Sequence, residues 1–250
     1  MKQTHMTTKT AINAVLAILA LMQFESSYAS VVVDARNADE DMAVYGDRLL
    51  DGLGYPLLAA DINGDGIKDV IVAATASDGL DQTEVNCGVV YVIFGSDSLP
   101  RSAQMAADAD ITIYGVEHGI NGAEGDEAGY ALAAADFNHD GIDDLVIAAI
   151  YGDGENNSRP DCGDVYIIYG RKDFPSLMDL EVDANVTIYG KDGGNGEGNP
   201  WDPDKGDLAG SALTVGDFNG DGMADLAIGA VLGDEPNESQ IHCGEVYILW

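Results

Sequence analysis

Three short stretches of the sequence carry oxygen-bearing side chains at a spacing that suits a hard cation. The first reads DINGDGIKD from Asp61 to Asp69, and the other two are DFNHDGIDD (136–144) and DFNGDGMAD (217–225). Ca²⁺ takes roughly six to eight oxygen ligands, and side chains at alternate positions of a tight loop can all turn inward. We therefore expect each stretch to bind one calcium ion.

The predicted ligands occupy the same places in each loop. Positions 1, 3, 5 and 9 supply side-chain oxygens, position 7 supplies a main-chain carbonyl, and position 6 is the glycine of the sharp turn. The first loop offers Asp61, Asn63, Asp65, the Ile67 carbonyl and Asp69. The second offers Asp136, Asn138, Asp140, the Ile142 carbonyl and Asp144, and the third offers Asp217, Asn219, Asp221, the Met223 carbonyl and Asp225.

Other interpretations of these loops are weaker. An EF-hand needs a Glu at position 12 and flanking helices, whereas this position holds Val72, Ile147 and Ile228 inside apolar runs. A plain hairpin turn suits Asn, Asp and Gly, but neighbouring carboxylates repel one another by about 1 kcal/mol per pair in water. Mg²⁺ is disfavoured because it keeps its waters in a strict octahedron. We expect His139, at position 4, to face solvent.

The loops belong to a unit that occurs three times, at spacings of 75 and 81 residues. Each unit has apolar and β-branched runs bounded by Gly, Asp and Asn, which predict strands, and no helical periodicity follows the N-terminal segment. The first two units end in ITIYG and VTIYG, so a unit has four strands. The first strand of each unit contains small Ala and Gly residues, which would fit where the strand backbones crowd together around a central axis. The sequence thus predicts an all-β fold, a β-propeller of four-stranded antiparallel blades.

The predicted domains are a signal peptide and a partial propeller. Residues 1–29 have basic, apolar and small-residue parts, and the apolar run is too short to span a bilayer, so we expect export. Residues 30–250 hold blade repeats at about 47–115, 116–190 and 191–250, the last without its fourth strand, and MAVYG (42–46) is an orphan closing strand. We expect the front part of a longer protein; a gene fragment is the alternative.

These repeats resemble the FG-GAP repeats of the integrin α-chain propeller and their bacterial relatives. GYALAAADFNHDGIDDLVIAA, GDVYIIYG and their counterparts carry the resemblance, which covers nearly all of the chain after the signal peptide. A Cys before the Gly of the third strand departs from that pattern. The resemblance implies more blades than three, calcium as scaffold, and partner contact on the face opposite the calcium loops.

The amino-acid composition limits the classes of binding partner that we expect. With 44 acidic and 11 basic residues, the net charge of -33 disfavours nucleic acid and anionic membranes. A halophilic surface would also be acidic, but here the acids gather in the repeats. We expect Cys87, Cys162 and Cys243, each followed by Gly, to be small buried side chains rather than disulfides.

The sequence predicts a binding module rather than an enzyme. The histidines lack zinc spacing, and no nucleophile elbow or phosphate loop is present. We expect a secreted or cell-surface module that binds a protein or glycan. Trp201 is its best contact candidate, although a Trp tucked over a blade edge is as consistent. By resemblance, the alternative is an accessory propeller of a larger secreted phospholipase or lyase; a structural envelope protein comes third.

Overall fold

The computed structural model describes residues 42–46, 48, 51–79, 86–100, 102–116, 125–194, 205–234 and 242–250. The chain divides into two units, and Val44–Leu99 with Ala103–Trp250 forms the unit that holds all three repeats. The predicted signal peptide and Trp201 lie outside the described residues. Among those residues, no helix is long and apolar enough to cross a membrane.

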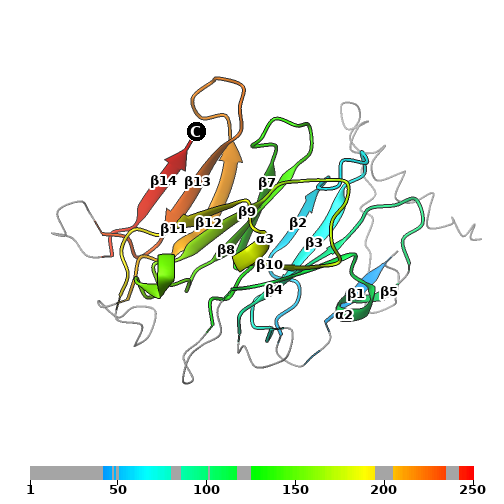
Figure 1. The fold of residues 1–250 in the computed structure, drawn as a ribbon, viewed down its shortest axis with the longest axis horizontal. Helices are drawn as coiled ribbons and strands as arrows, with labels where there is room; N and C mark the ends of the chain where they lie inside the picture. Colours follow the sequence, from blue (N-terminus) through cyan, green and yellow to red (C-terminus); the bar gives the residue numbers. More distant parts are fainter. Residues whose placement is uncertain are drawn as a thin grey trace, which may run out of the picture. The chain divides into compact units, whose positions relative to one another are not determined.

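The repeats form the predicted antiparallel blades (Figure 1). The first has β2 (Leu57–Ala60), β3 (Asp69–Ala74), β4 (Val89–Ile93) and β6 (Ile111–Tyr114). The second has β7 (Ala131–Ala135), β8 (Asp144–Ala149), β9 (Asp164–Ile168) and β11 (Val186–Tyr189). The third has β12 (Ala209–Gly216), β13 (Asp225–Ala230) and β14 (Glu245–Leu249). Neighbouring strands within each blade pair antiparallel, which confirms the all-β prediction.

Short helical segments accompany the strands. Between the third and fourth strands of each complete blade lie a short strand and a four-residue helix. They are β5 (Ser102–Gln104) with α2 (Met105–Asp108), and β10 (Leu177–Asp179) with α3 (Leu180–Asp183). A 3₁₀ turn, η3, covers Glu155–Asn157. The orphan segment forms β1 (Ala43–Tyr45), which shares a two-stranded sheet with β5.

Residues 177–183, here called the strap, fasten the second blade to the first. β10 pairs in parallel with β6, so a fifth strand from the second repeat completes the sheet of the first blade. Met178 and Leu180 are each 1% exposed and lie in the core between these blades, whereas Leu177 on the same strand is 46% exposed. The strap therefore adds both backbone pairing and apolar burial across the blade boundary.

Small residues allow the blades to approach closely. β2 contacts β7, and β7 contacts β12, so the first strands of successive blades are neighbours. Gly129 has φ +95°, and a Cβ there would lie 2.7 Å from the Cβ of Ala73 in the first blade. Gly210, with φ +93°, meets Ala148 of the second blade at the same distance. The small residues at these positions thus match the crowding that the sequence predicts.

The Cys-Gly pairs lie at the same boundaries. The Cys87 carbonyl accepts a hydrogen bond from the Ala128 amide at 2.9 Å, and the Cys162 carbonyl accepts one from the Ala209 amide at 2.9 Å. Both side chains are buried, as predicted for small core side chains. Cys243 is exposed, so the prediction is wrong for the third repeat, where no described residue takes the place of Ala128 or Ala209.

Thiol labelling under native conditions checks this arrangement. Burial raises the pKa of Cys162 to about 12, so this thiol holds its proton and stays shielded. We expect a thiol reagent at pH ~8 to modify Cys243 quickly and the other two cysteines only after unfolding. The Cys243→Ser variant is expected to lose the fast phase, and fast labelling of all three thiols would contradict the packing.

Candidate metal centres and an acidic cavity

The three predicted calcium loops connect the first two strands of each blade. They join β2 to β3, β7 to β8 and β12 to β13, and Figure 1 shows these hairpins along one edge of the blades. The antiparallel order places the loops that join second to third strands, such as 150–163, at the opposite edge. The two sets of loops therefore present different surfaces.

The position 1 carboxylate organises each loop. Asp61 Oδ1 accepts hydrogen bonds from the Gly64 and Asp65 amides at 2.8 and 3.1 Å, and Oδ2 accepts one from the Gly66 amide at 2.8 Å. Asp136 and Asp217 accept the equivalent bond from the position 6 glycine, each at 2.9 Å. A side chain that gathers successive amides holds its loop in a tight turn around itself.

Positions 3 and 5 bend back over the loop in the same way. Asn63 Oδ1 accepts from the Asp65 amide at 2.9 Å, and Asp65 Oδ1 accepts from the Ile67 amide at 2.8 Å. The other two loops repeat both bonds at 2.8–2.9 Å. The three loops therefore share one conformation, which carries the oxygens of positions 1, 3 and 5 toward the loop centre.

The position 9 carboxylates are buried at the base of the loops. Asp69 and Asp144 are 0% exposed and Asp225 is 1% exposed. Asp69 accepts from the Ile62 amide at 3.0 Å and, through its other oxygen, from the Gly95 amide at 2.9 Å. Asp144 is held equivalently by the amides of residues 137 and 170, at 2.9 and 2.8 Å. Asp225 Oδ1 has no hydrogen-bond partner among the described residues.

The electrostatics of these carboxylates fit a cation. Burial raises the pKa of Asp69, with smaller contributions from the charges of Asp61 and Asp65. Burial also raises the pKa of Asp144, and the charge of Asp140 adds to it. No ion pair among the described residues involves a position 9 carboxylate. A bound divalent cation would supply the missing positive charge at each loop.

The predicted ligands are all oxygen donors, which hard cations such as Ca²⁺ prefer. Within the described part of the chain, no three His, Cys, Asp or Glu side chains converge into a preformed site. A calcium set of the predicted kind adds an Asn amide and a main-chain carbonyl to the carboxylates, so it does not depend on acids alone. His139 is exposed, as predicted, and the side chains of Ile67 and Met223 are 41% and 43% exposed.

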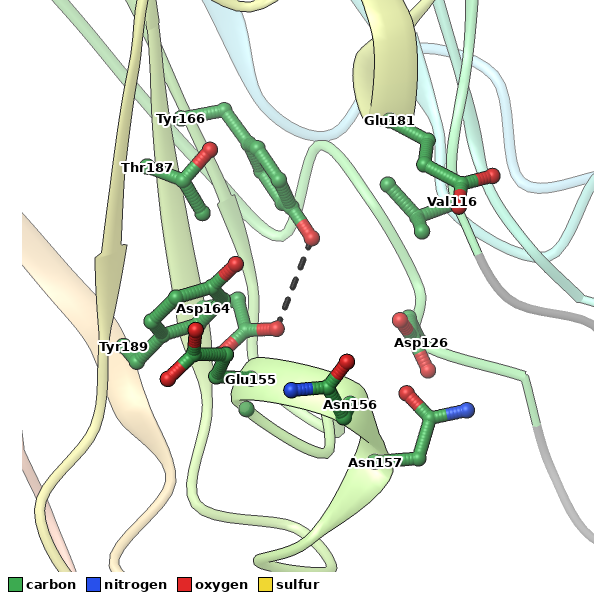
Figure 2. A pocket seen from close by; sticks show the side chains of 11 residues that line it. Val116, Asp126, Glu155, Asn156, Asn157, Asp164, Tyr166, Glu181, Thr187 and Tyr189 are labelled. Carbon is green, nitrogen blue, oxygen red and sulfur yellow. Dashed lines mark hydrogen bonds between the residues drawn. The ribbon is translucent and has the colours of Figure 1, made fainter.

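A cavity of about 580 Å³ lies among loops of the other edge (Figure 2). Its carboxylates come from four different segments of the chain, and hydroxyl and amide groups complete the wall. The lining comprises Val116, Asp126, Gly154, Glu155, Asn156, Asn157, Asp164, Tyr166, Glu181, Thr187 and Tyr189. Among the described lining residues none is basic, although the Arg159 guanidinium lies 5.8 Å from the centre of the Tyr189 ring. This polar wall favours ligands that donate hydrogen bonds or carry positive charge.

Asp164 is a strongly perturbed acid in the wall of this cavity. It is 4% exposed, and the Tyr166 hydroxyl donates a hydrogen bond to it at 3.4 Å (Figure 2). Burial raises the pKa of Asp164 to about 6, although the Gly154 amide, Cys162 and Tyr166 act against the shift. The charge of nearby Asp153 raises it further.

The perturbed acid predicts a pH dependence of stability. Asp164 has a pKa of about 6 in the folded chain against 3.8 as its ordinary value, so the folded state binds the extra proton between these values. The resulting stabilisation is present below pH ~4 and is lost as the pH rises through about 6. The free energy of unfolding of Asp164→Asn, compared with that of the unaltered chain, should therefore rise by about 2 kcal/mol when the pH is raised from ~4.5 to ~8.

Thermal melts in EGTA at both pH values measure this difference. Asp173→Asn, which removes an exposed carboxylate of the same blade, controls for the general effect of net charge. Equal pH responses of the two variants would show that Asp164 does not titrate as described.

Sequence reasoning did not single out Asp164 or Tyr166. Both lie in β9, whose apolar pattern predicts only a core strand. A sequence signal for this site does exist. Buried acids recur at the same spacings as the loops, at Asp51, Asp126 and Asp207, and indicate that acidic groups repeat at this edge. Trp201, the predicted contact residue, lies outside the described residues, so the structure does not place it.

Comparisons with known proteins agree with the fold. Residues 128–168 and 209–241 match the FG-GAP repeat family. The chain is 33% identical over 178 residues to rat phosphatidylinositol-glycan-specific phospholipase D (Rattus norvegicus), covering 70% of this chain and 18% of that protein. The bovine protein of the same name (Bos taurus) is 32% identical over 179 residues, 71% of this chain and 18% of that protein.

Integrin chains give matches of similar extent. Integrin alpha-8 of chicken (Gallus gallus) is 24% identical over 192 residues, 76% of this chain and 15% of that protein. The chain therefore carries FG-GAP repeats and is similar to integrin α chains, as the sequence motifs suggest. It spans less than a fifth of the length of these curated relatives.

Proposed function

We propose that this chain is an exported, calcium-binding FG-GAP propeller module that binds a protein or glycan. The observation that carries the calcium part is the shared conformation of three loops, in which oxygens of positions 1, 3 and 5 turn inward above a buried carboxylate. Calcium, when bound, supplies positive charge that offsets carboxylate repulsion in each hairpin. The proposed ligands are the fifteen residues named for the three loops above.

The chain's own residues perform the structural part of this role. Asp61, Asp136 and Asp217 gather amides and fix the turns, while Asp69 and Asp144 tie the first two loops to the ends of the third strands. Binding to the folded state alone stabilises it by about 2.7 kcal/mol per site at a hundredfold excess over the dissociation constant. The ions thus act as scaffold and not as catalysts in this proposal.

The ligand surface is proposed at the edge opposite the calcium loops, in a secreted or cell-surface protein. The cavity around Asp164 and Tyr166 supports this placement, because it combines convergent polar groups with tyrosine rings. We propose no catalysis by this chain.

A glycan and matrix-protein array, probed with the calcium-loaded chain, tests the ligand surface. We expect at least one ligand whose binding falls tenfold or more with Asn157→Arg at the cavity, because the added side chain blocks the hollow and changes its charge. Asp173→Ala, at an exposed site outside the cavity wall, is the matched control and is expected to keep binding. Binding that survives Asn157→Arg would place the contact elsewhere.

The second candidate function is an accessory propeller of a larger secreted enzyme. The similarity to phosphatidylinositol-glycan-specific phospholipase D favours it, since that protein's name states an activity on a glycolipid. Vesicles that carry a phosphatidylinositol-glycan distinguish the two candidates. Binding to these vesicles, and not to vesicles without the glycan, would favour the accessory role.

A further inference from the structure

Hydrogen bonds join the first two calcium loops directly, whereas none joins the second loop to the third. The Asp143 side chain, at position 8 of the second loop, accepts a hydrogen bond from the Asp61 amide at 3.0 Å. The Asp143 amide in turn donates to the Asp61 carbonyl at 3.1 Å. Both bonds reach position 1 of the first loop, where that loop's turn begins.

Neighbouring contacts strengthen this junction. Lys68, at position 8 of the first loop, forms an ion pair with the same Asp143 Oδ2 at 2.6 Å. Ile142 lies against Gly64, where an added Cβ would come within 2.8 Å of the Ile142 side chain. The Arg171 amide donates to the Ile62 carbonyl at 2.9 Å. The second blade therefore holds the first loop at several points.

The third loop lacks this junction. Its position 8 residue is Ala224, which has no side-chain acceptor for the Asp136 amide. No hydrogen bond joins 136–144 to 217–225, both of which the structure describes in full. At this boundary the place of Gly64, position 4 of the second loop, is taken by His139, which is exposed. The chain thus contains one joined pair of loops and one separate loop, which provides an internal control.

We infer that Asp143 is a positioning residue for the calcium site of the first loop, so that the first two sites bind calcium as a coupled pair and the third binds independently. The inference rests on the proposed calcium function. Its physical basis is that Asp143 fixes the backbone of Asp61, the residue whose carboxylate gathers the rest of that loop. Calcium that orders residues 142 and 143 therefore favours the bound form of the neighbouring loop, and the effect is reciprocal.

Three glycine amides report the sites separately. Gly66, Gly141 and Gly222 hold position 6 of their loops, and each donates to its position 1 carboxylate at 2.8–2.9 Å. Calcium binding at that carboxylate changes this hydrogen bond, so the amide resonance of each glycine follows its own loop. A calcium titration of the full, ¹⁵N-labelled chain, read by NMR, gives three midpoints in one experiment.

The decisive variant is Asp143→Ala. We expect the Gly66 midpoint to move to about fivefold higher calcium or more, while the Gly222 midpoint stays within twofold. Asp143→Asn keeps an oxygen that accepts from the Asp61 amide, and it is expected to restore most of the first loop's affinity. Lys68→Ala removes only the exposed ion pair, and it is expected to move Gly66 by less than twofold.

Each outcome bears on a different claim. A Gly66 midpoint that does not move in Asp143→Ala overturns the inference, including the case in which Gly141 alone moves. Equal shifts of Gly66 and Gly222 also overturn it, because they indicate a general loss of structure or charge. If none of the three glycines of the unaltered chain responds to calcium, the proposed function itself fails, which is a separate result.

Discussion

Removing calcium with EGTA is expected to lower the melting temperature of the chain by roughly 5–10 °C for each site emptied. Each loop carries carboxylates at positions 1, 5 and 9, and without the cation the position 9 acids stay buried, with raised pKa values at Asp69 and Asp144. Repulsion and desolvation then oppose folding at all three hairpins. Thermal unfolding followed by circular dichroism measures the shift.

Two controls accompany that melt. Calcium added in excess over the chelator should restore the original melting temperature, and the same concentration of Mg²⁺ should restore much less, because Mg²⁺ retains its waters. If EGTA, calcium and magnesium all leave the melting temperature unchanged, the calcium assignment is wrong.

Truncating the strap is expected to have the second large effect. Met178→Ala should cost about 2–5 kcal/mol, because the methionine is 1% exposed in the core between the first two blades and its removal leaves a cavity. The loss should appear in urea unfolding as a lower midpoint. It should persist with calcium present, since Met178 lies in the apolar core and is not one of the proposed calcium ligands.

Leu177→Ala is the matched control for the strap. Leu177 precedes Met178 on β10 but is 46% exposed, so its truncation should change stability by less than about 0.5 kcal/mol. If both variants unfold alike, the strap does not bury Met178 as described.

The repeats and loops could be predicted because their signals are local and repeated. A strand of five or six apolar residues is evident from composition, and a DxNxDG turn specifies its own conformation through side chains such as Asp61 and Asn63. The copies at fixed spacing confirm each assignment. The order of the four strands then follows because consecutive strands joined by short loops pair antiparallel.

The strap could not be predicted by the same means. A three-residue strand followed by a four-residue helix is too short to show periodicity, and Met178 and Leu180 stand among polar neighbours. The only sequence signal is repetition, since SAQMAADAD (102–110) and LMDLEVDAN (177–185) occupy equivalent places. Their pairing with a neighbouring blade depends on tertiary contacts that no local pattern contains.

The cavity and the Asp143 junction were missed for a related reason. Asp164 begins an otherwise apolar strand, and its burial depends on the loop 150–163 folding over it. In the sequence, Asp143 cannot be distinguished from the other acids of its loop. It gains the Asp61 amide and Lys68 as partners only because the first hairpin lies beside it in the fold. Sequence reasoning identified the loop residues that we propose as metal ligands, whereas contacts between repeats required the structure.

Counting bound calcium is the most direct test of the central claim. Isothermal titration calorimetry of the full chain should give three calcium ions per chain, and Asp136→Ala and Asp217→Ala should each reduce the count by one. These aspartates organise equivalent loops, so each variant disables one site. A count of zero, or a count that neither variant changes, would contradict the account.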